Sequence, residues 1–154
     1  MACWRQKGMV FIVENKLDIS ALKKAAETFY KALAFAKKVE SKNDDEREDY
    51  EFEIVRASLI QHFEFSYELC WKTMKRYIEM DIGPEADILT RRDLFRLSVE
   101  RRLIADFDNW LEYHKARNKT SHIYDEDIAT EVYNIAKMFA DDLRAFVGIM
   151  ENRI

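Results

Sequence analysis

The chain has 154 residues, of which 48% are hydrophobic and 35% are charged, and its formal net charge at pH 7 is −4. A chain of this length forms one domain with a sizeable core, and its negative charge argues against a general nucleic-acid coat protein, which is normally basic. Three Gly and one Pro are too few for the turns of a many-stranded sheet, so the composition favours long helices joined by short connections.

Nothing near the N-terminus resembles a signal peptide, and the longest apolar run there, residues 9–13, is too short to span a membrane. The two cysteines, Cys3 and Cys70, make no disulfide framework. We therefore expect a cytoplasmic protein that makes no use of a membrane. Residues 1–17 are expected to form an N-terminal segment, disordered in part, and residues 18–154 a single helical-bundle domain.

Apolar side chains recur three and four residues apart in three long stretches and two short ones, which is the pattern of amphipathic helices. Good N-cap residues stand before several of these stretches. In chain order, the predicted helices run from about Ser20 to near Ser41, from about Val55 to just before Gly83-Pro84, from Thr90 to about Leu103, from Asp106 to Asn118, and from about Glu126 to Glu151. The sequence therefore predicts an all-α antiparallel bundle of about five helices.

Basic residues gather in two places despite the negative net charge. Five of the residues between 91 and 102 are arginines, and residues 115–119 carry three cations. The simplest interpretation of the first group is a solvated helix face with ion pairs to Asp93 and Glu100. The second group surrounds the most informative part of the chain.

Residues 117–124, Arg-Asn-Lys-Thr-Ser-His-Ile-Tyr, place a permanent cation, an imidazole and a phenol close together. On one continuous helix, positions five apart are turned by about 140°, so Arg117 and His122 would diverge. Thr120 and Ser121 favour a break between them, because both hydroxyls compete for backbone hydrogen bonds, and Asp125 is a good N-cap for the next helix. We therefore expect this segment to form a helix end and a tight connection, where side chains can converge.

Arg117 and His122 suit the chemistry of a phosphate ester. A guanidinium group directs two donors at a carboxylate or phosphate, and an imidazole moves protons near neutral pH. Together they suit metal-free RNA cleavage, in which the imidazole transfers the proton and the guanidinium stabilises charge on phosphorus. The spacing alone favours a structural role, in which Arg117 binds the carbonyls at a helix C-terminus and His122 tethers the next helix.

Two further side chains have alternative roles. Tyr124 follows His122 by two residues, so in an extended connection both would project to the same side; otherwise Tyr124 packs between helices. Glu68 lies four residues before Lys72 on one predicted helix, which suggests a solvated ion pair. Alternatively, Glu68 is a carboxylate that orients the Arg117–His122 site.

The sequence predicts neither a metal site nor a cofactor. The three histidines lack the helical ligand spacing with acidic residues, and no Glu-x-x-His pair of the di-iron bundle type occurs. The chain also contains no Gly-rich phosphate loop, which argues against it being a nucleotidyltransferase itself.

The segment Arg117-x4-His122-x-Tyr124, with Asn118 directly after the arginine, resembles the signature of HEPN domains. The branch that it resembles most is the one called nucleotidyltransferase substrate-binding proteins. The likeness extends to residues 63–72, Phe-Glu-Phe-Ser-Tyr-Glu-Leu-Cys-Trp-Lys, and to residues 103–110, and it covers about residues 18–152. The chain departs from the family at Arg101-Arg102, where a small residue and Gly are expected.

This resemblance implies a HEPN-like bundle in which Arg117 and His122 are the active pair, with Asn118 and Glu68 as binding residues beside them. It implies a homodimer with the motif in the cleft between subunits, which also supplies the second imidazole that RNA cleavage needs. It further implies a partner, a small nucleotidyltransferase encoded nearby, which is thought to attach AMP to the tyrosine at position 124.

Two functions fit the resemblance. The chain is either a non-catalytic subunit that binds nucleotide or nucleic acid and pairs with that enzyme, or a metal-independent endoribonuclease, the toxin of a two-component toxin–antitoxin module. We take the first as the primary hypothesis.

Overall fold

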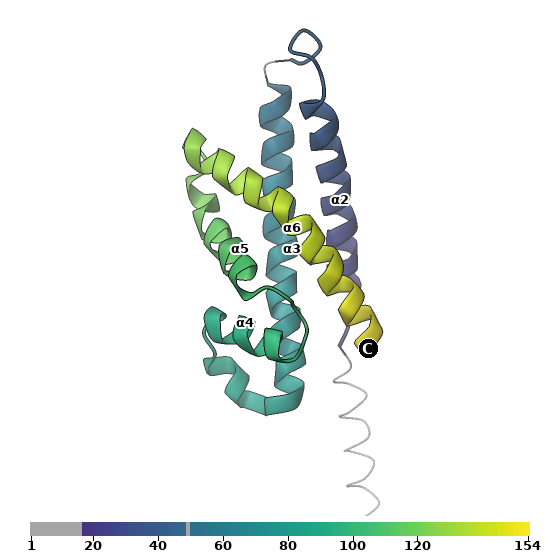
Figure 1. The fold of residues 1–154 in the computed structure, drawn as a ribbon, viewed down its shortest axis with the longest axis vertical. Helices are drawn as coiled ribbons and strands as arrows, with labels where there is room; N and C mark the ends of the chain where they lie inside the picture. Colours follow the sequence, from purple (N-terminus) through teal and green to yellow (C-terminus); the bar gives the residue numbers. More distant parts are fainter. Residues whose placement is uncertain (1–16, 49) are drawn as a thin grey trace, which may run out of the picture.

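The computed structural model describes residues 17–48 and 50–154, so the predicted N-terminal segment lies outside the described residues except for Leu17. The described part contains five α-helices, two 3₁₀ helices and no strand, which confirms the all-α bundle (Figure 1). In chain order the elements are α2 (Ser20–Glu40), α3 (Glu51–Ile82), η1 (Gly83–Ile88), α4 (Arg91–Glu100), α5 (Phe107–Lys119), η2 (Thr120–His122) and α6 (Glu126–Arg153).

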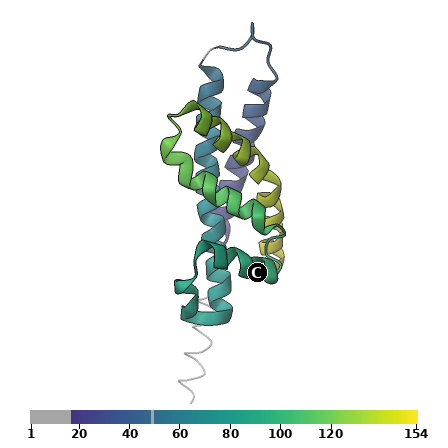
Figure 2. The ribbon, with the colours of Figure 1, turned by 60° about the vertical axis from the view of Figure 1, so that its left-hand side comes forward.

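Helices α2 and α3 lie side by side as an antiparallel pair, and α6 crosses them (Figure 1). Helix α5 packs along α6 and α3, while α4 and η1 lie at the C-terminal end of α3 (Figure 2). The start of α6 and the end of α5 therefore meet at one end of the bundle, and the C-terminus of α6 lies near the other. None of the helices in the described ranges is long and apolar enough to cross a membrane.

The core is centred on the ring of Phe139, which is fully buried on α6. Its centroid lies 5.6, 5.2, 5.7 and 5.0 Å from those of Phe29, Phe63, Trp110 and Tyr113, all in edge-to-face geometry. Aromatic pairs of this kind contribute about 0.5–1.5 kcal/mol each beyond the burial of their area. One side chain thus joins α2, α3, α5 and α6, which fixes α5 against α3.

The three predicted N-caps are confirmed. Thr90 and Asp93 form a capping box at the start of α4. Asp106 accepts from the backbone N–H of Asn109 at 3.0 Å, and Asp125 accepts from two backbone N–H groups at the start of α6. Each cap satisfies backbone donors that have no partner inside the helix, so the starts of α4, α5 and α6 are well defined.

Two boundaries differ from the sequence prediction. The 3₁₀ helix η1 begins at Gly83, although Gly83-Pro84 suggested only a helix end; proline fits the first turn of a helix because its missing N–H would be unpaired there. Helix α4 ends at Glu100 instead of about Leu103, because Arg102 has a φ of 59° and leaves the right-handed helical region.

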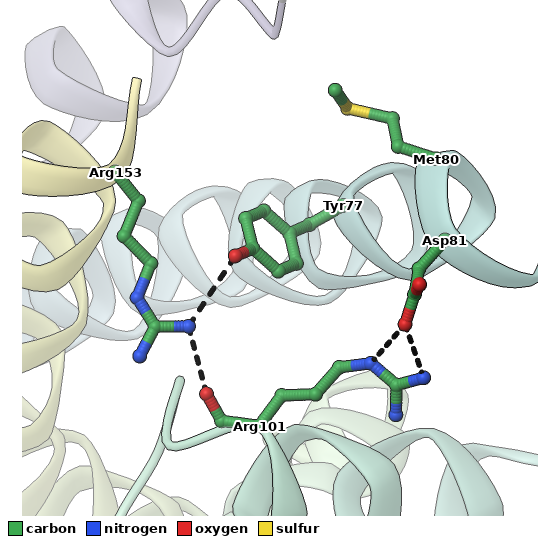
Figure 3. A pocket seen from close by; sticks show the side chains of 5 residues that line it. All are labelled: Tyr77, Met80, Asp81, Arg101 and Arg153. Carbon is green, nitrogen blue, oxygen red and sulfur yellow. Dashed lines mark hydrogen bonds and ion pairs between the residues drawn. The ribbon is translucent and has the colours of Figure 1, made fainter.

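The connection after α4 is held by two arginines, which join it to α3 and α6 (Figure 3). Arg153, near the end of α6, donates to the carbonyl oxygens of Arg101 at 2.7 Å and Arg102 at 3.2 Å. Arg101 in turn pairs with Asp81 of α3 at 2.6 Å. These side chains, with Tyr77, line a cavity of about 540 Å³. Since every arginine in it already has an oxygen partner, we interpret this cavity as structural.

Candidate functional site

The segment 117–124 forms a helix end and a compact connection, as predicted. Helix α5 ends at Lys119, and the Thr120 hydroxyl donates to the Arg117 carbonyl at 2.8 Å. The turn η2 follows, and the backbone N–H of Asp125 donates to the carbonyl of His122 at 3.0 Å. The connection is not extended, since His122 lies in a 3₁₀ turn and Ile123 is also in the right-handed helical region, so the condition for His122 and Tyr124 to project as in a strand is not met.

The start of α6 is tied to α3 by a buried arginine. Arg56 donates from both terminal nitrogens to the two carboxylate oxygens of Glu126, at 2.6 and 2.9 Å. This fork-to-fork hydrogen bonding lowers the pKa of Glu126. The connection that carries His122 is therefore anchored at its α6 end, one residue after the Asp125 cap.

Arg117 projects from the last turn of α5 toward two carboxylates of α3. Its Nε lies 3.2 Å from Glu68 Oε1, and its Nη1 lies 3.8 Å from Glu64 Oε2 and donates to the Thr120 hydroxyl at 3.1 Å. The approach to Glu68 is an ion pair by distance, but its angle leaves the buried Nε without a hydrogen bond. Within the described residues, the Arg117 side chain forms no hydrogen bond to a helix-end carbonyl. The guanidinium group is held between α5 and α3.

Glu68 connects this arginine to a tryptophan. Its Oε2 accepts from Trp71 Nε1 at 3.1 Å, while its Oε1 faces Arg117. The predicted ion pair between Glu68 and Lys72 is wrong, because Lys72 Nζ lies over the Trp71 ring, 5.7 Å from its centroid. Glu68 turns toward α5 instead, where a guanidinium group offers a closer charge partner. The alternative interpretation, an orienting carboxylate, agrees with this position.

His122 and Tyr124 lie on the surface of the connection. The Tyr124 side chain is 85% exposed, and its Oη lies 3.5 Å from His122 Nδ1, with the two rings edge to face. In the described part of the chain, no hydrogen bond joins His122 to Arg117, and the imidazole does not tether α6. The imidazole and the phenol are open to solvent, whereas the guanidinium group of Arg117 is half-buried.

Asn118 belongs to a polar chain that the sequence reasoning missed. Its Nδ2 lies 3.4 Å from His114 Nε2, and His114 Nδ1 lies 2.8 Å from the hydroxyl of the buried Tyr67. Burial, followed by the charge of Arg91, lowers the pKa of His114, and burial raises the pKa of Tyr67. Both shifts favour the uncharged form of the side chain. The spacing of four between His114 and Asn118 was a signal, because such residues are neighbours on a helix.

Arg91 was also missed, since it was assigned to a solvated arginine group. Within that group only Arg96 pairs with Asp93, at 3.7 Å, and Arg101 pairs with Asp81 of another helix. The Arg91 guanidinium carbon instead lies 3.3 Å from the centroid of the Trp71 ring. The solvated-face interpretation is therefore wrong for Arg91. As for a metal site, no group of three or more potential ligands occurs between residue 17 and the C-terminus, residue 49 aside.

Comparison with known proteins gives matches at three levels. The family model described as nucleotidyltransferase substrate binding protein like matches residues 17–152. A Haemophilus influenzae protein named probable ribonuclease HepT is 42% identical over 79 residues, which are 50% of this chain and 54% of that protein. The chain thus matches about half the length of this relative.

Two solved structures are similar over most of the chain. A Haemophilus influenzae protein, described as having the fold of a substrate binding domain of a nucleotidyltransferase, has a TM-score of 0.73 and 29% identity. That alignment covers 84% of this chain and 98% of the other. A Thermus thermophilus protein has a TM-score of 0.57 and 25% identity, with 78% of this chain and 96% of the other covered.

Proposed function

Because the chain belongs to the nucleotidyltransferase substrate-binding branch of the HEPN family, we propose that it is a binding subunit that pairs with a separate small nucleotidyltransferase encoded nearby. It binds nucleotide or nucleic acid at the connection between α5 and α6. The observation that carries this proposal is a guanidinium group oriented by Glu68, followed within one short turn by the exposed His122 and Tyr124. A phosphate meets charge-assisted donors there at little cost in ordering.

The partnership is tested by co-expression and pull-down. The tagged chain, expressed with a small nucleotidyltransferase from the same locus, is expected to retain it in a stable complex, whereas an unrelated tagged helical protein is not. If both proteins are folded and no complex is recovered, the two-component proposal is wrong.

The exposed surface beside the site supports a homodimer. Ile54 and Phe65 of α3 are 60% and 52% exposed. They are eleven residues apart and lie on one stripe of the helix, and Phe65 lies about 60° around α3 from Glu68. A two-fold contact over this stripe would bury both side chains and bring a second Arg117 and His122 to the first pair.

Phe65 and Phe35 form a matched test of this assembly, because both are exposed phenylalanines, at 52% and 55%, on different helices. Phe65→Lys is expected to convert the dimer to a monomer at micromolar concentration in light scattering, because it places a charge in an apolar contact. Phe35→Lys is expected to remain dimeric. If the wild type is a monomer at the same concentration, a site built from the Arg117–His122 pairs of two protomers is excluded.

A second candidate function is metal-independent RNA cleavage by a toxin, and the relative named as a probable ribonuclease favours it. In this reaction the 2′-oxygen attacks phosphorus, the bond to the 5′-oxygen breaks, and a cyclic phosphate forms. One imidazole takes the 2′-hydroxyl proton, and a second, protonated imidazole gives a proton to the leaving oxygen. His122 from each protomer would fill these roles, and Arg117 would stabilise the charge on phosphorus.

Cleavage in the presence of EDTA tests this candidate. His122→Ala or Arg117→Ala is expected to lower the rate by about 10²–10⁴, with helicity and dimerisation unchanged. Equal cleavage by the wild type and both variants would identify a contaminating nuclease, and the binding-subunit proposal would stand without the enzymatic one.

A further inference from the structure

Arg91, the first residue of α4, is a half-buried cation without a partner. Across residues 17–48 and 50–154 it forms no hydrogen bond or ion pair, its guanidinium group lies over the Trp71 ring, and its Nε is buried without an acceptor. Burial accordingly lowers the pKa of Arg91. A guanidinium group carries five N–H donors, and leaving them partly desolvated and unpaired costs free energy that an anion would offset.

The position of Arg91 is fixed by stacking. Its guanidinium carbon lies 3.3 Å from the centroid of the Trp71 ring, so the guanidinium plane covers the indole face. Trp71 is itself held by the hydrogen bond from its Nε1 to Glu68 at 3.1 Å. The edge donors of Arg91 are therefore presented from a rigid platform, which lowers the ordering cost of binding an anion.

The same carboxylate links this platform to the site described above. Glu68 uses one oxygen for Trp71 and has the other 3.2 Å from Arg117 Nε. Lys72 lies over the same indole ring. Arg117 therefore faces the two carboxylates of α3, and Arg91 and Lys72 add two further cations at the neighbouring Trp71 ring.

His114 belongs to the same environment as Arg91. The charge of Arg91 is, after burial, the main cause that lowers the pKa of His114. Helix α5 carries His114 one turn before Asn118 and Arg117, and the Tyr67 hydroxyl fixes its ring at 2.8 Å. The polar chain of Asn118 and His114 therefore runs along α5 beside Arg117.

We infer that Arg91, stacked on Trp71, binds a phosphate of a single-stranded nucleic acid next to the phosphate held at Arg117. This inference rests on the proposed binding of nucleic acid at Arg117 and His122. A strand presents negative charges at regular short intervals, and it can therefore meet two arginines that are linked through Glu68 and Trp71.

Fluorescence anisotropy of a short labelled 2′-O-methyl oligoribonucleotide tests the subsite, because this probe lacks the free 2′-hydroxyl and is not cleaved. Arg91→Gln is expected to weaken binding about tenfold or more, the loss of one hydrogen-bonded charge. It should also lower the slope of log affinity against log salt concentration by about 0.7, the value for one phosphate contact on a single strand.

Arg92→Gln is the matched control. Arg92 is the exposed neighbour of Arg91 in the same turn of α4, so its loss changes the net charge equally. For Arg92→Gln, the affinity for the oligonucleotide and the slope of log affinity against log salt concentration are expected to stay close to those of the wild type. Arg91→Lys, which keeps the charge and loses the stacked fork, is expected to keep the salt slope and to weaken binding less than Arg91→Gln.

The outcomes separate the subsite from the function on which it rests. If Arg117→Gln weakens binding while Arg91→Gln matches Arg92→Gln, the subsite is wrong and the nucleic-acid function stands. If the wild type does not bind the probe at all, both are wrong. If Arg91→Gln leaves the probe bound but disrupts the complex with the nucleotidyltransferase, Arg91 meets a protein carboxylate and the phosphate subsite is refuted.

Discussion

Replacing Arg102 by glycine is expected to stabilise the protein. Arg102 has a φ of 59°, and its side chain forms no hydrogen bond or ion pair with any described residue. A non-glycine residue in the left-handed region costs about 1–2 kcal/mol. Glycine removes this cost but gives the unfolded chain more conformational entropy, which lowers the free energy of unfolding by about 0.4–1 kcal/mol. The midpoints of these two ranges leave a net gain of about 0.8 kcal/mol. The Arg102 carbonyl that accepts from Arg153 is retained in the variant.

Thermal unfolding followed by circular dichroism measures this gain as a rise in Tm of about 1–4 °C. Arg101→Gly is the matched control, since Arg101 has an ordinary φ of −86° and pairs with Asp81 at 2.6 Å. That variant is expected to lower Tm. A fall in Tm for Arg102→Gly as large as that for Arg101→Gly would refute the strain at this position.

Three further substitutions test the core, a titrating group and the exposed phenol. Phe139→Ala is expected to cost about 3–5 kcal/mol in urea unfolding, whereas Phe35→Ala, at an exposed position, should stay within about 0.5 kcal/mol; similar losses would contradict the central place of Phe139. Because the folded state lowers the pKa of His114 from its usual 6.5, the unfolded chain binds more protons, so the stability present above pH 6.5 falls as the pH is lowered. His114→Gln should therefore reduce the loss of stability between pH 7 and pH 5, and an unchanged pH dependence would exclude this contribution. Incubation with the nucleotidyltransferase, ATP and Mg²⁺ is expected to add AMP to the Tyr124 peptide in mass spectrometry, and an adduct that persists in Tyr124→Phe would return Tyr124 to a structural role.

Helix starts were predictable because capping is local chemistry. Thr90, Asp106 and Asp125 each satisfy backbone donors within three residues, so their roles follow from the sequence alone. The early end of α4 was not predicted, because the left-handed φ of Arg102 is imposed on a residue that gives no local sign of it. The family departure at that position, arginine where Gly is expected, was nevertheless the right place to look.

The candidate site was predictable only where its residues are close in sequence. The break after α5 and the exposure of Tyr124 follow from residues 117–125. The contacts of Glu68 with Arg117 and of Arg91 with Trp71 depend on how α3 packs against α5 and α4, which periodicity does not specify. Arg91 therefore looked like one cation of a solvated face.

The most direct test of nucleic-acid binding at the α5–α6 junction uses the three histidines of the chain, His62, His114 and His122. Histidine-selective isotope labelling lets NMR follow each imidazole while the 2′-O-methyl oligoribonucleotide is added. We expect the His122 and His114 resonances to shift together and saturably, and His62, on α3, to stay in place. A bound oligonucleotide that leaves His122 and His114 unshifted would contradict the proposed site.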